Sequence, residues 1–140
     1  RYNQLKKAEE FLGVEYLGSI KPKQFDENKI NDKLILKRAK HVVSENERVI
    51  QAKQSILKKD IKIFGKLMNE SHQSYARDFD ASTRDVDLIV DRSIASGAEG
   101  ARLTGGGFGG FTVSLINKNF IQEWKKNMLK FYDSKNIFEV

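Results

Sequence analysis

The sequence predicts an α+β domain in which helices pack on an antiparallel sheet. Apolar residues recur at helical spacing through most of residues 2–94 and again over 119–132. Apolar and polar residues alternate in two short runs, 101–104 and 111–115, which a glycine-rich segment joins. Because helices that flank a hairpin in sequence commonly pack as a layer on its sheet, we expect residues 1–140 to form a single domain.

The N-terminal half is predicted to be helical with one irregular interruption. Residues 2–12 place Leu5, Ala8 and Leu12 on one helical face, whereas glycines and the single proline punctuate residues 13–28. Residues 29–57 carry the longest helical pattern. Its apolar stripe comprises Ile35, Ala39, Val42, Val49 and Ile56, and Asn46 lies within it. We expect Asn46 to satisfy a buried backbone group there.

Two further helices are predicted before the first strand. One covers residues 60–76, with Met68 and Tyr75 turned inward. The next begins near Thr83, and Gly97 is suited to its end. We expect Ser82 and Asp85 to form a capping box at its start. The buried stripe of this helix comprises Val86, Ile89, Val90 and Ile94.

The C-terminal part is predicted to contain the hairpin, one helix and a short final strand. Ala101 and Leu103 alternate with polar residues, as do Phe111, Val113 and Leu115 in the second run. Residues 119–132 return to a helical pattern, and residues 137–140 have the composition of a strand.

Composition narrows the class of function. The chain has 25 Lys and Arg against 19 Asp and Glu, a net charge of +6, but the basic residues are dispersed along it. No recognition-helix or RNA-platform motif accompanies them, so we expect no nucleic-acid binding. No apolar run approaches the roughly 20 residues that cross a bilayer, so no membrane association is expected. The absence of cysteine is typical of a reducing compartment, which predicts a cytoplasmic protein.

Residues 105–110 contain five glycines in six positions. Each glycine costs roughly 0.5–1 kcal/mol of ordering entropy relative to alanine, and a plain hairpin needs only one or two of them. The excess indicates a backbone that wraps closely around a ligand with its amides exposed. Phosphate oxygens are the usual match for such amides. A merely tight or flexible turn is the alternative.

Three other ligand motifs are excluded by their context. Gly105, Gly107 and Gly110 have the dinucleotide-binding spacing, but a strand follows them where that motif requires a helix. No Lys-Ser or Lys-Thr pair closes a P-loop. A calcium loop over Asp78, Asp80 and Ser82 fails because threonine and isoleucine occupy the positions that need glycine and glutamate.

Three segments resemble one known family. Residues 100–113 read Gly-Ala-Arg-Leu-Thr-Gly-Gly-Gly-Phe-Gly-Gly-Phe-Thr-Val. This resembles the third motif of the galactokinase branch of the GHMP kinases, usually Gly-(Ser/Ala)-Arg-Met-Thr-Gly-(Gly/Ala)-Gly-Phe-Gly-Gly-Cys. Residues 38–49 are similar to the family's Arg-Ala-x-His-Val-Val-x-Glu-x-x-Arg helix, and residues 64–74 to its Phe-Gly-x-Leu-Met-x-x-Ser-His-x-Ser helix. Tyr2-Asn3 matches the family's Tyr-Asn pair.

The resemblance implies the GHMP-kinase C-terminal domain of a two-domain enzyme. Such an enzyme uses ATP and Mg²⁺ to phosphorylate the anomeric hydroxyl of galactose, giving galactose 1-phosphate. It implies that the catalytic residues and most ATP and Mg²⁺ contacts lie in an N-terminal domain absent from this chain, so we expect the chain alone to be inactive. We therefore assign no catalytic or metal-binding residue. The resemblance implies that Tyr2 contacts the sugar. The resemblance also implies that the nucleotide and the sugar bind in a cleft between the two domains. We expect this cleft to be closed by Thr104, Gly105, Gly106, Gly107, Phe108, Gly109 and Gly110.

Departures from the family pattern leave the sugar open. Arg77 is displaced by one position, the usual Cys-Pro pair is missing near Ser82, and Phe111 replaces the usual cysteine. The alternatives are a kinase of another sugar, such as N-acetylgalactosamine or a uronic acid, and a regulator that binds sugar and ATP without turnover.

Four other polar residues are interpreted as structural. His72 is expected to be a hydrogen-bonded core histidine, and His41 to pair with Glu45 one turn away. Asp87 and Asp91 share a helix face that we expect to be solvated.

Overall fold

The computed structural model describes all residues 1–140 and confirms the predicted α+β class. Its α-helices are α1 (Tyr2–Leu12), α2 (Lys33–Leu57), α3 (Ile61–Ser74), α4 (Arg84–Ala95) and α5 (Ile121–Met128). Strands β1 (Gly100–Thr104) and β2 (Phe111–Leu115) form the sheet, and short 3-10 turns fill the connections. No helix has both the length and the apolarity needed to span a membrane.

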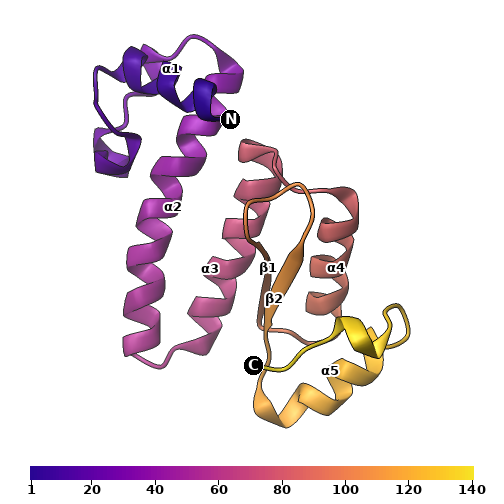
Figure 1. Ribbon diagram of the computed structural model, residues 1–140. Helices are drawn as coiled ribbons and strands as arrows, with labels where there is room; N and C mark the ends of the chain where they lie inside the picture. Colours follow the sequence, from indigo (N-terminus) through magenta and orange to yellow (C-terminus); the bar gives the residue numbers. More distant parts are fainter.

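The two strands form one antiparallel hairpin whose ends meet at Thr104 and Phe111. Helices α3 and α4 pack against this hairpin, and α2 lies beside α3 (Figure 1). The loop between the strands therefore lies at the same end of the molecule as the start of α1 and the end of α3 (Figure 1). That end holds the candidate site.

Two apolar clusters support this arrangement. The larger packs α1 and the irregular segment after it onto the first half of α2, and it includes Ala8, Leu17 and Ala39. The smaller places Trp124 and Met128 of α5 under Ala98. One apolar cluster thus stabilises α1 and α2, and the other stabilises α5 beside the residues that lead into β1. The glycine loop extends from the hairpin between them.

The predicted boundaries of three helices need correction. Helix α2 begins at Lys33 rather than residue 29, because the side chain of Asp32 accepts from the amides of Leu34 and Ile35 and caps it there. Helix α3 ends at Ser74, and a π-helix, η4 (Tyr75–Phe79), continues it. Helix α5 spans only Ile121–Met128 of the predicted 119–132.

Two predictions of local structure are wrong. The capping box of Ser82 and Asp85 does not form, because Thr83 caps α4 by accepting from the amide of Val86. Residues 137–140 form no strand, since they have no neighbouring strand to pair with in this chain. Asn46 satisfies a backbone group as predicted, since its side-chain amide donates to the carbonyl of Gly18 at 3.1 Å.

Candidate functional site

The glycine loop 105–110 is built almost entirely from left-handed backbone. Gly105, Gly107, Gly109 and Gly110 have φ values between 88° and 125°, and Phe108 also has a positive φ of 61°. Residues with a Cβ rarely adopt this region, so the glycines at these four positions are a conformational requirement. The excess of glycine that the sequence displays is therefore used to turn the backbone repeatedly.

One hydrogen bond anchors this loop to the rest of the chain. The amide of Phe108 donates to the carbonyl of Ala81 at 2.6 Å. Beside it, Gly107 lies so close to Ala81 that an added Cβ would be 2.6 Å from the same carbonyl and 2.8 Å from the hydroxyl of Tyr75. The loop is thus docked at its centre against the segment that follows η4.

The remaining amides of the loop are unpaired. The N–H groups of Gly105, Gly106, Gly107, Gly109 and Gly110 donate to no acceptor within the chain. Neither Thr104, at the end of β1, nor the loop glycines Gly105, Gly106 and Gly110 are buried. Unpaired amides on a bent backbone can bind anionic oxygens.

The start of α1 reaches the same end of the molecule. The guanidinium of Arg1 donates to the carbonyl of Phe79, pairs with the carboxylate of Asp80 at 2.7 Å and lies 5.7 Å from the ring centroid of Phe108. Tyr2 follows directly, and its side chain is 71% exposed. Arg1, the residue before the predicted sugar-contacting Tyr2, thus reaches Phe108 of the loop, although more than 100 residues separate them in sequence.

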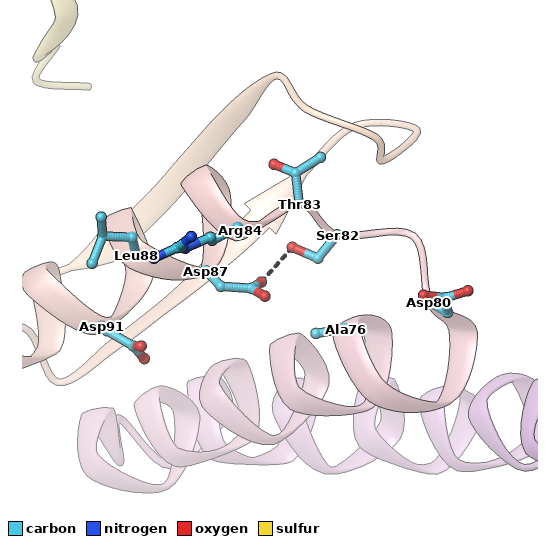
Figure 2. A pocket seen from close by; sticks show the side chains of 8 residues that line it. All are labelled: Ala76, Asp80, Ser82, Thr83, Arg84, Asp87, Leu88 and Asp91. Atoms are coloured by element: carbon cyan, nitrogen blue, oxygen red, sulfur yellow. Dashed lines mark hydrogen bonds between the residues drawn. The ribbon is translucent and has the colours of Figure 1, made fainter.

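A hollow of about 440 Å³ lies beside the anchoring segment. Figure 2 shows its lining residues on η4, on the segment that follows η4 and on α4. The lining comprises Ala76, Asp80, Ser82, Thr83, Arg84, Asp87, Leu88 and Asp91. Of its three carboxylates, that of Asp80 pairs with Arg1 and Arg38, which leaves Asp87 and Asp91 beside Arg84.

Asp87 and Asp91 are accessible to solvent as predicted, with the Asp87 side chain 44% exposed, but Asp87 also makes contacts that the prediction did not include. Its carboxylate accepts from the hydroxyl of Ser82 at 2.5 Å and lies 3.2 Å from Nε2 of His72, without the alignment of a hydrogen bond. The sequence pattern missed this because helical spacing places Asp87 on a polar face without showing that α3 packs near it.

His72 supports β1 from α3, which confirms its structural interpretation. Its Nδ1 accepts from the amide of Leu103 at 3.3 Å, so the neutral ring carries its proton on Nε2. Burial lowers the pKa of His72, and the Asp87 carboxylate opposes this only in part. His72 therefore holds the strand that leads into the loop in its neutral form.

His41 does not pair with Glu45 as predicted. Its Nδ1 lies 3.0 Å from the hydroxyl of Ser74, and its ring stacks on Phe79 and meets Tyr75 edge-on. Burial lowers the pKa of His41 to about 4, although the Glu45 carboxylate nearby favours protonation. Glu45 instead accepts from Arg48 and from Ser71 of α3. His41 thus packs η4 onto α2.

Sequence reasoning assigned no role to two residues that organise the loop. Ala81 carries the anchoring carbonyl, a backbone role that any residue type could fill. Arg38 is 2% exposed and reaches the turn at Asp78–Asp80 from α2. The family resemblance includes Arg38 as the first residue of its helix motif, but that motif does not say what Arg38 contacts. No group of three His, Cys, Asp or Glu side chains that could hold a metal ion is present.

Known proteins match this chain along nearly its whole length. It is 37% identical over 138 residues to the galactokinase of Clostridium acetobutylicum, which covers 96% of this chain and 36% of that protein. It is 39% identical over 131 residues to the galactokinase of Fusobacterium nucleatum, covering 91% of this chain and 34% of that protein. The chain therefore spans about a third of the length of these curated relatives.

A solved structure and a family model agree with these matches. The crystal structure of Lactococcus lactis galactokinase complexed with galactose superposes with a TM-score of 0.84 at 28% identity, covering 90% of this chain and 34% of that chain. Residues 52–133 match the model described as GHMP kinases C terminal. Because that match covers more than half of the chain and includes the glycine loop, the chain belongs to the family of GHMP kinase C-terminal domains.

Proposed function

We propose that this chain is the C-terminal domain of a galactokinase, which transfers a phosphoryl group from ATP to the anomeric hydroxyl of galactose. One observation carries the proposal: the glycine loop presents five unpaired amides on a docked, left-handed backbone. The names of the relatives and the galactose in the Lactococcus complex support the choice of sugar.

In this proposal the loop closes over the phosphate end of the nucleotide. ATP supplies the phosphoryl group, and its oxygens carry the negative charge that the free amides of residues 105–110 would stabilise. The positive φ of Phe108 is held by its bond to Ala81, so the amides are oriented before a ligand arrives. Tyr2, exposed beside this end of the molecule, would contact the sugar.

The proposal divides the work between two domains. We place the catalytic residues, Mg²⁺ and most nucleotide contacts in an N-terminal domain, since this chain spans about a third of the length of its relatives. In this proposal the N-terminal domain contacts the outer side of the hairpin. Phe111 and Val113 of β2 are exposed, and a mainly apolar hollow of about 250 Å³ lies between β2 and helices α2 and α3.

We also propose that the protein acts in the cytoplasm. The reaction consumes ATP, and the chain has no cysteine that would need an oxidising compartment. Both points are consistent with the cytoplasmic location that the composition predicts.

The first test is ATP-dependent phosphorylation of a sugar panel by the full-length protein that carries this chain. The panel contains galactose, N-acetylgalactosamine and galacturonic acid, and the 140-residue chain alone is the control. Turnover of galactose by the full-length protein and none by the chain is expected. Preference for another sugar would replace galactose as substrate, and binding of ATP without any turnover would indicate a regulator.

The second test addresses the loop. Gly107→Ala combines a positive φ of 88° with a Cβ that would meet the carbonyl of Ala81. We expect Gly107→Ala to weaken ATP binding by about tenfold or more, because displacing the anchor misplaces charge-assisted hydrogen bonds. Gly97→Ala, after α4 and outside the loop, is the control, because it also has a positive φ, 105°, but no atom within 4 Å of an added Cβ. Wild-type ATP affinity in Gly107→Ala would remove the loop from the nucleotide site.

A further inference from the structure

Arg38 is the only lysine or arginine of the chain that is fully enclosed, with 2% of its surface exposed. Its guanidinium makes three contacts: Nη1 donates to the carbonyl of Asp78, Nη2 pairs with the carboxylate of Asp80 at 3.0 Å, and Nε donates to the side chain of Gln4 at 3.3 Å. Burying a cation is costly unless such partners are in place, so these contacts fix the geometry around it.

The turn that Arg38 holds is conformationally unfavourable. Asp80 has φ 53° and ψ 50°, which is left-handed backbone for a residue with a Cβ. It follows directly on the π-helix η4, a rare local structure. Two guanidinium groups, those of Arg38 and Arg1, converge on its carboxylate. The contacts to Arg38 therefore stabilise a turn that backbone preferences alone do not favour.

This turn leads directly to the single anchor of the glycine loop. Ala81 is the next residue, it is completely buried, and its carbonyl accepts from the amide of Phe108 at 2.6 Å. The Cβ of Ala81 lies against Gly107. A shift of the turn at Asp80 would consequently move both the acceptor and the surface on which the loop rests.

We propose that Arg38 is a positioning residue for the glycine loop: it fixes the turn at Asp78–Asp80 and thereby sets the Ala81 carbonyl that holds the loop in its binding conformation. Arg38 itself touches no ligand in this proposal. An arginine suits the role because its planar group serves three acceptors in fixed directions, whereas a lysine offers one point charge. The link to nucleotide affinity rests on the proposed function of the loop.

A purely structural role for Arg38 makes a different prediction, and a second arginine provides the control. Arg92 of α4 lies 4.1 Å from the ring centroid of Phe131 and donates to the hydroxyl of Tyr132. These contacts concern the C-terminal segment and not the loop. Arg92→Met therefore removes a partly buried guanidinium without disturbing the loop anchor.

The test compares Arg38→Met, Arg38→Lys and Arg92→Met in the full-length protein. Hydrogen exchange of a peptide containing residues 105–111 is measured without ligand, and the dissociation constant for ATP is measured by titration. In Arg38→Met we expect the Phe108 amide to exchange about tenfold faster and ATP to bind about tenfold more weakly, since a charge-assisted hydrogen bond contributes that much. Arg38→Lys should recover part of both effects, and Arg92→Met should change neither.

The outcomes separate this inference from the proposed function. Unchanged exchange of the loop in folded Arg38→Met and Arg38→Lys proteins would overturn the positioning role. Faster exchange with unchanged ATP affinity, in a protein whose wild type binds ATP, would overturn its link to binding. A wild type that binds no ATP would refute the function proposed for the loop, while the exchange measurement still decides the role of Arg38.

A second substitution keeps the inference testable if Arg38→Met does not fold. Asp80→Asn retains an acceptor oxygen and a residue type that tolerates left-handed backbone, but removes the charge that Arg38 pairs with. The Asp80 side chain is 65% exposed, so the variant is expected to fold. We expect faster exchange of the Phe108 amide in Asp80→Asn than in wild type, and equal exchange would overturn the proposal.

Discussion

Gly65 of α3 and Gly100 at the start of β1 pack backbone against backbone. A Cβ added to Gly65 would lie 2.3 Å from the carbonyl oxygen of Glu99, and one added to Gly100 would lie 2.3 Å from the carbonyl oxygen of Gly65. Both obstacles are main-chain atoms, which cannot rotate aside as a side chain would. This contact sets how closely the helix approaches the strand that leads to the glycine loop.

Alanine at either position should therefore destabilise the fold. Alanine favours a helix interior over glycine by about 1 kcal/mol, which partly offsets the clash at Gly65. Overpacking of this kind costs typically 1–3 kcal/mol, and we expect a net loss in that range, larger for Gly100→Ala because it gains nothing from helix propensity. Urea unfolding of the full-length protein measures it. Gly106→Ala, with open space around it, is the control and should change stability by less than about 0.5 kcal/mol.

Because of its two buried histidines, we expect the folded protein to lose stability in mild acid. Burial lowers the pKa of His41 to about 4 and also lowers that of His72, both from an ordinary value of 6.5. Below pH 6.5 the two histidines therefore bind protons in the unfolded chain but remain neutral in the folded chain. Stability therefore falls as the pH drops below 6.5, and for His41 this loss continues to about pH 4. Each proton that is excluded from the folded state costs at most about 1.4 kcal/mol per pH unit.

Unfolding measured at several pH values between 6.5 and 5 isolates this effect. Glu9 and Glu45 have lowered pKa values, so their contributions are lost only below about pH 4.5, outside the window. His41→Gln removes the titrating group and should flatten the slope even if it lowers stability overall. An unchanged slope in His41→Gln would show that His41 is not the group responsible.

The start of α4 provides a direct test of which residue caps it. Thr83 accepts from the amide of Val86, whereas Ser82 bonds to Asp87. Thr83→Ala should cost about 1 kcal/mol, the usual value for a lost N-cap. Ser82→Ala removes only a bond to a partly exposed carboxylate and should cost less. The reverse order of the two losses in urea unfolding would restore the sequence-based assignment of Ser82 as the cap.

The local elements were predictable because periodicity records them directly. The hairpin follows from alternation on either side of the glycines, and the left-handed φ values of four glycines explain why the sequence needs them. The choice between Ser82 and Thr83 as cap was not predictable, since both residue types cap well and the acceptor depends on where Asp87 lies. The prediction of a final strand was wrong because residues 137–140, despite their strand propensity, have no partner strand to pair with.

The residues that meet at the candidate site are far apart in sequence. Arg1 and Asp80 are 79 residues apart, and Arg38 and Asp80 are 42 apart, so no local pattern records either pair. The glycine loop was identified from composition and family resemblance, but its anchor at Ala81 uses a main-chain carbonyl that leaves no mark on residue type. The sequence thus predicted which backbone segment would bind a ligand, and the fold shows what holds that segment in place.

Ser93 of α4 provides a last prediction, because its hydrogen bonds join α4 to β2 and to α5. It is completely buried on α4, its hydroxyl lies 2.7 Å from that of Ser114 on β2, and the indole N–H of Trp124 on α5 donates to its Oγ at 3.1 Å and its carbonyl at 3.2 Å. Ser93→Ala leaves the Ser114 hydroxyl without its partner, which should cost about 1–3 kcal/mol. Ser114→Ala retains the bond from Trp124 and should cost less. In urea unfolding, the double variant should be no less stable than Ser93→Ala, because the orphaned hydroxyl is then gone; additive losses would mean that the two serines act independently.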